Sequence, residues 1–167
     1  QVWNETSAHL DIDAENIVGC LYTIPPQPNN DALLQKTLKT VSGFKNLRWF
    51  GYLSSTAVYG DHHGLWVNEK SLLAPSTPRG QKRLKSERHC LAFARVKECA
   101  VTIYRLAGIY GPGRSVFERF DQTDFQNIYA PQSVFSRIHL EDIIRLLTLS
   151  FKRSSWSSIY NLADQYP

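Results

Sequence analysis

The chain contains 167 residues, of which 43% are hydrophobic and 20% are charged, and its formal net charge is +4. This composition is that of an ordinary globular domain, so intrinsic disorder, collagen and coiled coil are excluded as architectures. No apolar run approaches the roughly 20 residues needed to cross a bilayer, which excludes a membrane span.

The first predicted elements are a strand and a helix. Residues 16–24 (NIVGCLYTI) form a nearly continuous apolar run that stops at Pro25, as is typical of a strand buried on both faces of a parallel sheet. Residues 31–41 then carry leucines and a valine at helical spacing, and Asp31 can cap the start of a helix. We therefore expect a helix over 31–41.

The middle of the chain predicts a strand, a long helix and another strand. The apolar strand over 47–54 is followed by a loop of small and polar residues over 55–64. Residues 79–97 contain no proline and are basic in their first half and apolar in their second, which favours a helix. A third strand is expected over 100–106, with a glycine-rich turn over 108–113.

The last predicted elements are an amphipathic helix over 140–151 and a short strand over 158–162. Glu141 and Asp142 lie in the first turn of this helix, where the positive end of the helix dipole favours acidic residues. The alternation of strands and helices along the chain predicts an α/β fold with a parallel sheet.

The chain contains no methionine and begins at Gln1, so we expect a processed chain or a piece of a longer protein. Its three cysteines, Cys20, Cys90 and Cys99, lack CxxC spacing and are expected to be reduced core residues. This cysteine usage predicts the cytoplasm or another reducing compartment, and an organelle stroma or matrix stays open.

Four stretches carry a resemblance to one family. They are residues 53–60 (LSSTAVYG), 105–113 (RLAGIYGPG), 136–142 (SRIHLED) and 159–164 (IYNLAD). In this order they resemble the extended short-chain dehydrogenases/reductases, the nucleotide-sugar epimerase and dehydratase group, and most of all an atypical subgroup. The resemblance implies a Rossmann-like, doubly wound parallel sheet that binds NAD or NADP.

The resemblance also implies where the family chemistry would lie. In that family a serine at the strand end binds the reacting oxygen of the substrate, and the tyrosine of a YxxxK helix transfers the proton. Ser55, four residues before Tyr59, falls at the serine position. Counting back from Glu87 puts Arg83 at the lysine position and Arg79 at the tyrosine position. Arginine stays protonated near neutral pH, so the standard Tyr/Lys catalysis is expected to be lost.

The resemblance also implies, from matching positions, which residues contact the cofactor and the substrate. The expected cofactor-binding residues are Pro25, Ser54, Ser55, Arg83, Leu106, Ala107 and Ile109. The expected substrate-binding residues are Tyr59, Arg114 and Arg137. No metal site is expected, because the adjacent side chains of His62 and His63 point apart and no third ligand is spaced nearby. His139 is more typical of a helix start than of a catalytic base.

The family's phosphate-binding GxxGxxG motif is missing from this sequence. The cluster Gly108, Gly111 and Gly113 contains Pro112 and follows a late strand, so it predicts a turn. Matching residues 16–24 to the family's fourth strand predicts that about 70 to 90 residues, including the glycine loop, precede them in the parent protein.

We therefore expect residues 1–167 to be a single partial NAD(P)-binding domain, incomplete at the N-terminus and shortened at the C-terminus. Residues after position 114 are expected to approach the small substrate-binding part. The intact parent is expected to bind NAD or NADP, and this piece weakly or not at all.

Residues 79–97 carry seven basic residues and one acidic residue. This segment is interpreted as a solvated or dimer-interface face, with a phosphate or cofactor contact as an alternative. A nucleic-acid surface is not favoured, because the four tryptophans are scattered.

Three functions stay open from the sequence. The first is an atypical NAD(P)-binding epimerase/dehydratase-like protein without the standard catalysis. The second is a non-catalytic structural or interaction subunit that keeps the Rossmann-like shape. The third is a nucleotide-sugar epimerase or reductase with an unconventional base. The expected partners are a second copy or a larger assembly, and a small molecule that resembles a nucleotide sugar.

Overall fold

A four-stranded parallel sheet forms the centre of the fold. In the computed structural model, which describes residues 14–26, 32–114, 134–153 and 157–166, the strand order is β1-β2-β3-β6. The four strands are β1 (Gly19–Tyr22), β2 (Trp49–Ser55), β3 (Ala100–Leu106) and β6 (Ser158–Leu162). Every neighbouring pair is parallel, as the apolar runs predicted.

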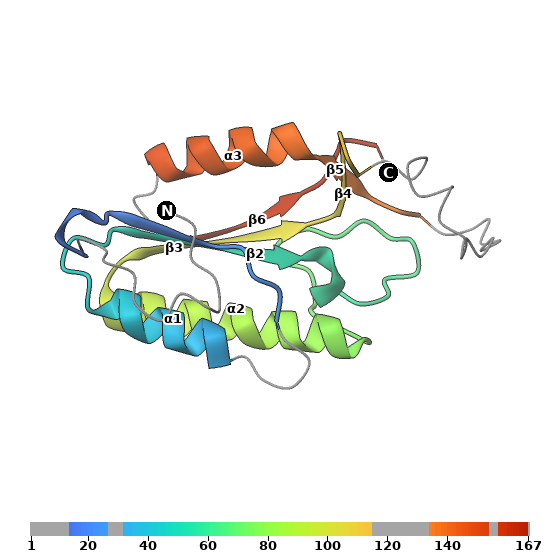
Figure 1. The fold of residues 1–167 in the computed structure, drawn as a ribbon. Coiled ribbons are helices and arrows are strands. Elements are labelled where there is room, and N and C mark those ends of the chain that lie inside the picture. Colours follow the sequence, from blue (N-terminus) through green and yellow to red (C-terminus); the bar gives the residue numbers. More distant parts are fainter. Residues whose placement is uncertain (1–13, 27–31, 115–133, 154–156, 167) are drawn as a thin grey trace.

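Helices cover both faces of the sheet. Helices α1 (Ala32–Ser42) and α2 (Pro78–Lys97) lie side by side below it, and α3 (Leu140–Arg153) lies above it (Figure 1). This arrangement confirms the predicted α/β, doubly wound architecture with a Rossmann-like parallel sheet. Within the described residues, no helix is both long enough and apolar enough to cross a membrane.

The two central strands are buried on both faces, because successive side chains of a strand point to opposite sides. Phe50 and Tyr52 of β2 pack in the core on the α1–α2 side, together with Ile103 of β3. Trp49 and Tyr104 belong to the core on the α3 side. This two-sided burial explains why β2 and β3 read as continuous apolar runs and not as alternating patterns.

The long basic helix is confirmed and begins one residue earlier than expected. The side chain of Thr77 caps it by accepting a hydrogen bond from the Gly80 amide at 3.1 Å, and Pro78 occupies its first turn. Glu98, with a φ of 56°, ends the helix in the left-handed conformation. The predicted capping residue Asp31 of the first helix lies outside the described residues.

Two other predictions were wrong in detail. The first strand begins at Gly19, because residues Ala14–Asn16 form a 3-10 turn. The segment expected to be only a turn includes a short strand, β4 (Gly108–Tyr110), which pairs in parallel with β5 (Arg137–His139). These two strands form a second small sheet beyond the carboxyl end of β3. A three-residue strand has no periodicity to detect, so only its pairing with a distant segment reveals it.

Candidate functional site

The predicted cofactor residues gather at the carboxyl edge of the sheet, where parallel strands end together. Ser55 at the end of β2 is in register with Leu106 at the end of β3. The hydroxyl of Thr56 donates a hydrogen bond to the Leu106 carbonyl at 3.4 Å, which ties the two strand ends. Pro25 follows the end of β1 on the same edge. Ala107 is buried and Ile109 is half-buried, directly beyond β3.

The two neighbouring serines have different environments. Ser54 is buried beneath the sheet, and its hydroxyl donates to Glu87 Oε1 at 2.5 Å. Ser55 is half-buried on the other side, and its Oγ accepts a hydrogen bond from the Ala57 amide at 3.2 Å, capping the 3-10 turn Thr56–Val58. The Ser55 hydroxyl therefore keeps its proton for another acceptor, whereas the Ser54 proton is engaged within the protein.

Arg83, which the sequence predicts at the family's lysine position, is turned into the protein. Arg83 is 7% exposed, and its Nη1 donates to the Leu53 carbonyl at 2.6 Å and to the Tyr52 hydroxyl at 3.2 Å. Its Nε is buried with no hydrogen-bond partner in the described part of the chain. Burial raises the pKa of Tyr52, and the Arg83 cation offsets part of that rise. Arg79 lies one turn earlier on α2 and is exposed.

A buried ion pair lies next to Ser54. Arg105 Nη2 donates to Glu87 Oε2 at 2.8 Å, and Arg105 Nε donates to Glu87 Oε1 at 3.1 Å. The two side chains are each 2% exposed. Burial alone lowers the pKa of Arg105, but the bonds to Glu87 and Tyr59 outweigh this effect and raise it above its usual value. The Arg105 guanidinium thus stays charged inside the protein.

Hydrogen bonds connect the ion pair to β6, the strand that pairs with β3. Arg105 Nη1 donates to the Tyr59 hydroxyl at 2.9 Å, and that hydroxyl donates to Asn161 Oδ1 at 2.6 Å. The Asn161 amide donates to Glu69 Oε1 at 2.7 Å, so the loop between β2 and α2 is tied to β6. We call Ser54, Tyr59, Glu87, Arg105 and Asn161 the Arg105 network. Tyr59, predicted to bind substrate, is 2% exposed within it.

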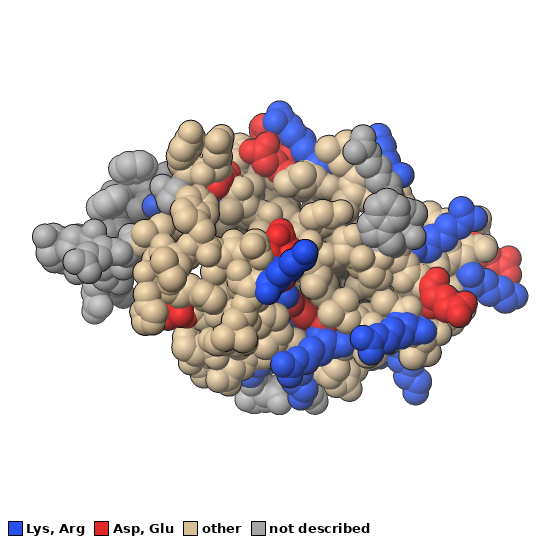
Figure 2. All heavy atoms as spheres, turned by 180° about the vertical axis from the view of Figure 1, so that it is seen from behind, with Lys and Arg blue, Asp and Glu red and all other residues tan. Residues whose placement is uncertain are grey.

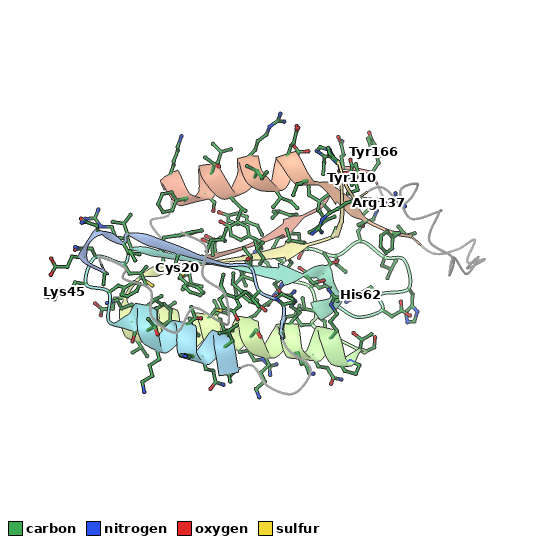
Figure 3. All side chains as sticks on the ribbon, viewed as in Figure 1. Cys20, Lys45, His62, Tyr110, Arg137 and Tyr166 are labelled. Carbon is green, nitrogen blue, oxygen red and sulfur yellow. The ribbon has the colours of Figure 1, made fainter. Side chains whose placement is uncertain are left out.

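The two predicted substrate arginines lie on or just after the strands of the second small sheet. Arg137 is exposed on β5, and Figure 3 shows it beside Tyr110 of β4. Tyr110 donates to Asp164 Oδ2 at 2.8 Å, and this bond is the main reason why the pKa of Tyr110 is raised. Arg114 is exposed four residues beyond Tyr110. Both arginines are exposed, and the guanidinium carbon of Arg137 lies 5.8 Å from the centre of the Phe135 ring.

His62, His63 and His139 each make local contacts. His139 Nδ1 accepts from the Glu141 amide at 3.3 Å, at the start of α3 as the sequence favoured. His62 contacts the Leu72 carbonyl, and His63 lies 3.6 Å from Asp61 in an exposed pair. Across the described ranges, no group of three His, Cys, Asp or Glu residues could hold a metal ion.

Cys20, Cys90 and Cys99 form no disulfide, and Cys90 and Cys99 are buried. Burial raises the pKa of Cys20 to about 11. A thiol with that pKa stays protonated near neutral pH and is a poor nucleophile. Burial therefore makes Cys20 an unreactive thiol.

Small residues and one hydroxyl lie at the strand ends. Ser55 ends β2, Ala107 follows β3, and the Ser55 hydroxyl has a proton to donate. A pyrophosphate needs closely spaced glycines before a helix, and the sequence has none between Gly19 and Gly43. The phosphate half of such a site therefore has no counterpart at this position.

Sequence reasoning found the strand ends but missed most of the Arg105 network. Glu87 served only to set the register of the helix, and Arg105 was noticed only as part of a motif. Nothing singled out Glu69 or Asn161, which lie 92 residues apart in the chain. An internal arginine in a strand otherwise buried on both faces was the available signal for a buried ion pair.

Comparisons with known proteins agree with this geometry. The model of the NAD dependent epimerase/dehydratase family matches residues 27–162. Protein YeeZ of Escherichia coli (strain K12) is 36% identical over 115 residues, which cover 66% of this chain and 38% of that protein.

Solved structures show the same fold. The structure of a functionally unknown conserved protein from Silicibacter pomeroyi DSS superposes with a TM-score of 0.83 and 35% identity, covering 96% of this chain and 56% of that one. UDP-glucuronic acid 4-epimerase from Bacillus cereus, in complex with NAD, gives a TM-score of 0.74 at 19% identity, with 90% and 55% coverage. The chain thus spans about half the length of these structures.

Proposed function

Because this chain belongs to the NAD dependent epimerase/dehydratase family, we propose that it holds the nicotinamide end of an NAD(P) site in which the standard Tyr/Lys proton transfer is lost. The observation that carries the proposal is the position of Arg83. It takes the place of the family's lysine, but its donors are directed to the Leu53 carbonyl and the Tyr52 hydroxyl. The cation is therefore engaged with β2 and not with a catalytic phenol.

Among the described residues, none of the phenols of Tyr52, Tyr59 and Tyr110 replaces the missing acid/base. The pKa values of Tyr52 and Tyr110 are both raised, the first mainly by burial and the second mainly by the bond to Asp164. A general base must lose its proton near neutral pH, and a raised pKa opposes this. The Tyr59 hydroxyl is held between Arg105 and Asn161. These contacts support an NAD(P)-binding protein without the family's usual proton relay.

The residues at the carboxyl edge have distinct roles in this proposal. The Ser55 hydroxyl binds a substrate oxygen, while Leu106, Ala107, Ile109 and Pro25 line the ring of the cofactor. A nicotinamide supplies hydride transfer when it is bound. Arg83 holds the end of β2 through the Leu53 carbonyl, and the Ser54 hydroxyl supports the strand end through Glu87.

The proposed substrate class is a nucleotide sugar or a molecule like it. Arg114 and Arg137 are exposed cations beyond the strand ends, and arginine suits diphosphate recognition. One similar structure, MoeE5 in complex with UDP-glucose and NAD, is 22% identical with a TM-score of 0.70. MoeE5 shares the fold of this chain, and this shared fold is the support that it gives to the proposed substrate class.

A turnover assay tests the loss of catalysis. UDP-glucose and UDP-glucuronic acid are incubated with NAD and the chain, and the sugars are separated by chromatography. We expect no epimerisation above the protein-free control. Turnover that Ser55→Ala abolishes and Ser42→Ala retains would contradict the proposal and favour an active enzyme with an unconventional base. Ser42 is a matched control because it is exposed at the end of α1, away from the carboxyl edge.

A further inference from the structure

An exposed aromatic ring lies beside the carboxyl edge of the sheet. Phe135 comes two residues before Arg137 of β5, and it is 64% exposed. A single exposed apolar side chain is common in proteins and needs no explanation by itself. Phe135 differs from such a residue because its contacts fix the ring next to the end of β3, where the proposed cofactor site lies.

The Phe135 ring is held against the backbone of Gly108. A Cβ added to Gly108 would lie 2.7 Å from Phe135 Cε1 and 3.1 Å from Phe135 Cζ, so the ring occupies the space of the missing side chain. The Gly108 amide donates a hydrogen bond to the Ser136 carbonyl at 3.1 Å, which ties this segment to β4. Because Gly108 follows Leu106 and Ala107, the ring lies directly beyond residues that are expected to contact the cofactor.

The cation of Arg137 lies over the same ring. Its guanidinium carbon is 5.8 Å from the ring centre, within the range of a cation–π contact. A guanidinium that stacks on a ring keeps N–H donors at its edge, and these donors suit phosphate oxygens. On the face that Figure 2 shows, most Lys and Arg side chains of the described residues lie away from the end that carries β4 and β5 in Figure 1. Few other cations on that face would therefore compete with Arg137 for an anion.

The acids of the neighbouring elements have partners of their own. Glu141 and Asp142, in the first turn of α3, both pair with Arg145, at 3.6 and 3.3 Å. Asp164 Oδ2 accepts a hydrogen bond from a tyrosine hydroxyl at 2.8 Å. These contacts engage the three carboxylates with groups other than the Arg137 guanidinium.

An aromatic ring next to a cation fits a sugar phosphate. The C–H groups on one face of a sugar ring carry a slight positive charge, and the face of an aromatic ring is negative. The phosphate of the same ligand supplies the charge that a guanidinium binds. We propose that Phe135 packs against the sugar ring of the substrate while Arg137 binds the neighbouring phosphate. This inference rests on the proposed substrate class, and it names Phe135 as the residue that selects for the sugar.

The test compares two ligands that differ by the sugar ring. Glucose 1-phosphate and inorganic phosphate are titrated separately into the isotopically labelled chain, and the amide shifts of residues 135–139 give both dissociation constants. We expect glucose 1-phosphate to bind about fivefold more tightly, because only this ligand has a ring to pack on Phe135. Phe135→Leu should bring the two constants together and leave phosphate binding unchanged. Arg137→Gln should weaken the binding of both ligands.

A matched control separates Phe135 from other exposed rings. Phe151→Leu makes the same change at an exposed phenylalanine of α3, and it should leave the preference for glucose 1-phosphate intact. Gly108→Ala keeps the Phe135 ring but pushes it from its place, so this variant should reduce the preference. The dispersion of the amide spectrum checks that each variant is folded. Loss of the preference in Phe151→Leu as well would contradict the assignment to Phe135.

Three further outcomes would overturn the inference. The first is equal affinity of the wild type for the two ligands, and the second is a preference that Phe135→Leu retains. The third is tighter binding of phenyl phosphate than of glucose 1-phosphate, which would make Phe135 a site for an aromatic group.

The cofactor site is tested separately, so the two failures can be distinguished. Shifts of residues 54–57 with nicotinamide mononucleotide, without a preference for glucose 1-phosphate, would refute the role of Phe135 alone. A preference that depends on Phe135, without shifts of residues 54–57, would contradict the proposed cofactor site and keep the role of Phe135.

Discussion

The buried pair between Arg105 and Glu87 is the residue-scale feature that connects the site to the fold. Each charge is removed from water, and this cost is offset by hydrogen bonds to Ser54, Tyr59 and the partner charge. These bonds join the end of β2, the turn after it, β3 and α2. The position of Ser55 at the strand end therefore depends on a pair that does not itself face the ligand.

Removing one charge of this pair should be costly. Glu87→Gln leaves Arg105 buried without a full counter-charge, and we expect the free energy of unfolding to fall by about 3 kcal/mol. Glu141→Gln is the control, because its ion pair with Arg145 at 3.6 Å is exposed and should contribute less than about 1 kcal/mol. Urea denaturation of the three proteins measures both values. Equal losses for the two variants would show that the buried pair is not held as described.

The motifs predicted which positions of the sequence belong to the site, but they did not predict how the side chains at those positions are oriented. The resemblance placed Ser55 and Arg83 in the sequence, and the structure places both near the carboxyl edge. It did not reveal that Arg83 turns toward Leu53 and Tyr52. That orientation depends on the Tyr52 phenol, which becomes a neighbour of α2 only through packing. The contact roles of Arg83 and Tyr59 toward ligands stay predictions.

At the scale of elements, the turn after β2 is fixed by a glycine. Gly60 has a φ of +77°, and a Cβ at this position would overlap the Ala74 carbonyl oxygen. The chain thus passes close to itself where the loop begins its course toward α2. The amide of Ala74 also donates to the Tyr59 carbonyl at 3.1 Å, which holds this close approach. Only glycine satisfies both the conformation and the space.

The effect of crowding at Gly60 can be separated from the effect of its positive φ. Gly113 has a similar φ of +72° but no atom within 4 Å of an added Cβ. We expect Gly113→Ala to lower the free energy of unfolding by about 1 kcal/mol, from backbone strain only. Gly60→Ala should lower it by more than about 3 kcal/mol, because backbone atoms must also move. If thermal unfolding shows the same loss for both, the close approach to Ala74 is wrong.

Elements with a long apolar run were predictable from the sequence, and those made by pairing were not. Strands β3 and β6 begin and end where their apolar runs do, at Ala100–Leu106 and Ser158–Leu162. Strands β4 and β5 have three residues each and exist because two distant segments meet. Their pairing carries Arg137 to the neighbourhood of Tyr110, so this part of the candidate site required the structure.

At the scale of the whole molecule, β1 and β6 are the edge strands of the sheet formed by the described residues. Strand order in a doubly wound sheet places the glycine-loop strand beside the strand that corresponds to β1. The chain spans 56% of the similar structure from Silicibacter pomeroyi. We therefore propose that the phosphate half of the cofactor site, where the protein has one, joins the sheet at β1. The domain assignment of residues 1–167 stays a prediction.

The central claim is that this chain contacts the nicotinamide end of the cofactor and not the adenosine end. NMR titration of the isotopically labelled chain with nicotinamide mononucleotide, and separately with AMP, tests it directly. We expect weak binding of nicotinamide mononucleotide, with amide shifts confined to residues 54–57 and 106–109, and no comparable shifts with AMP. Shifts with AMP as large as those with nicotinamide mononucleotide, or no shifts at these residues with either, would contradict the account.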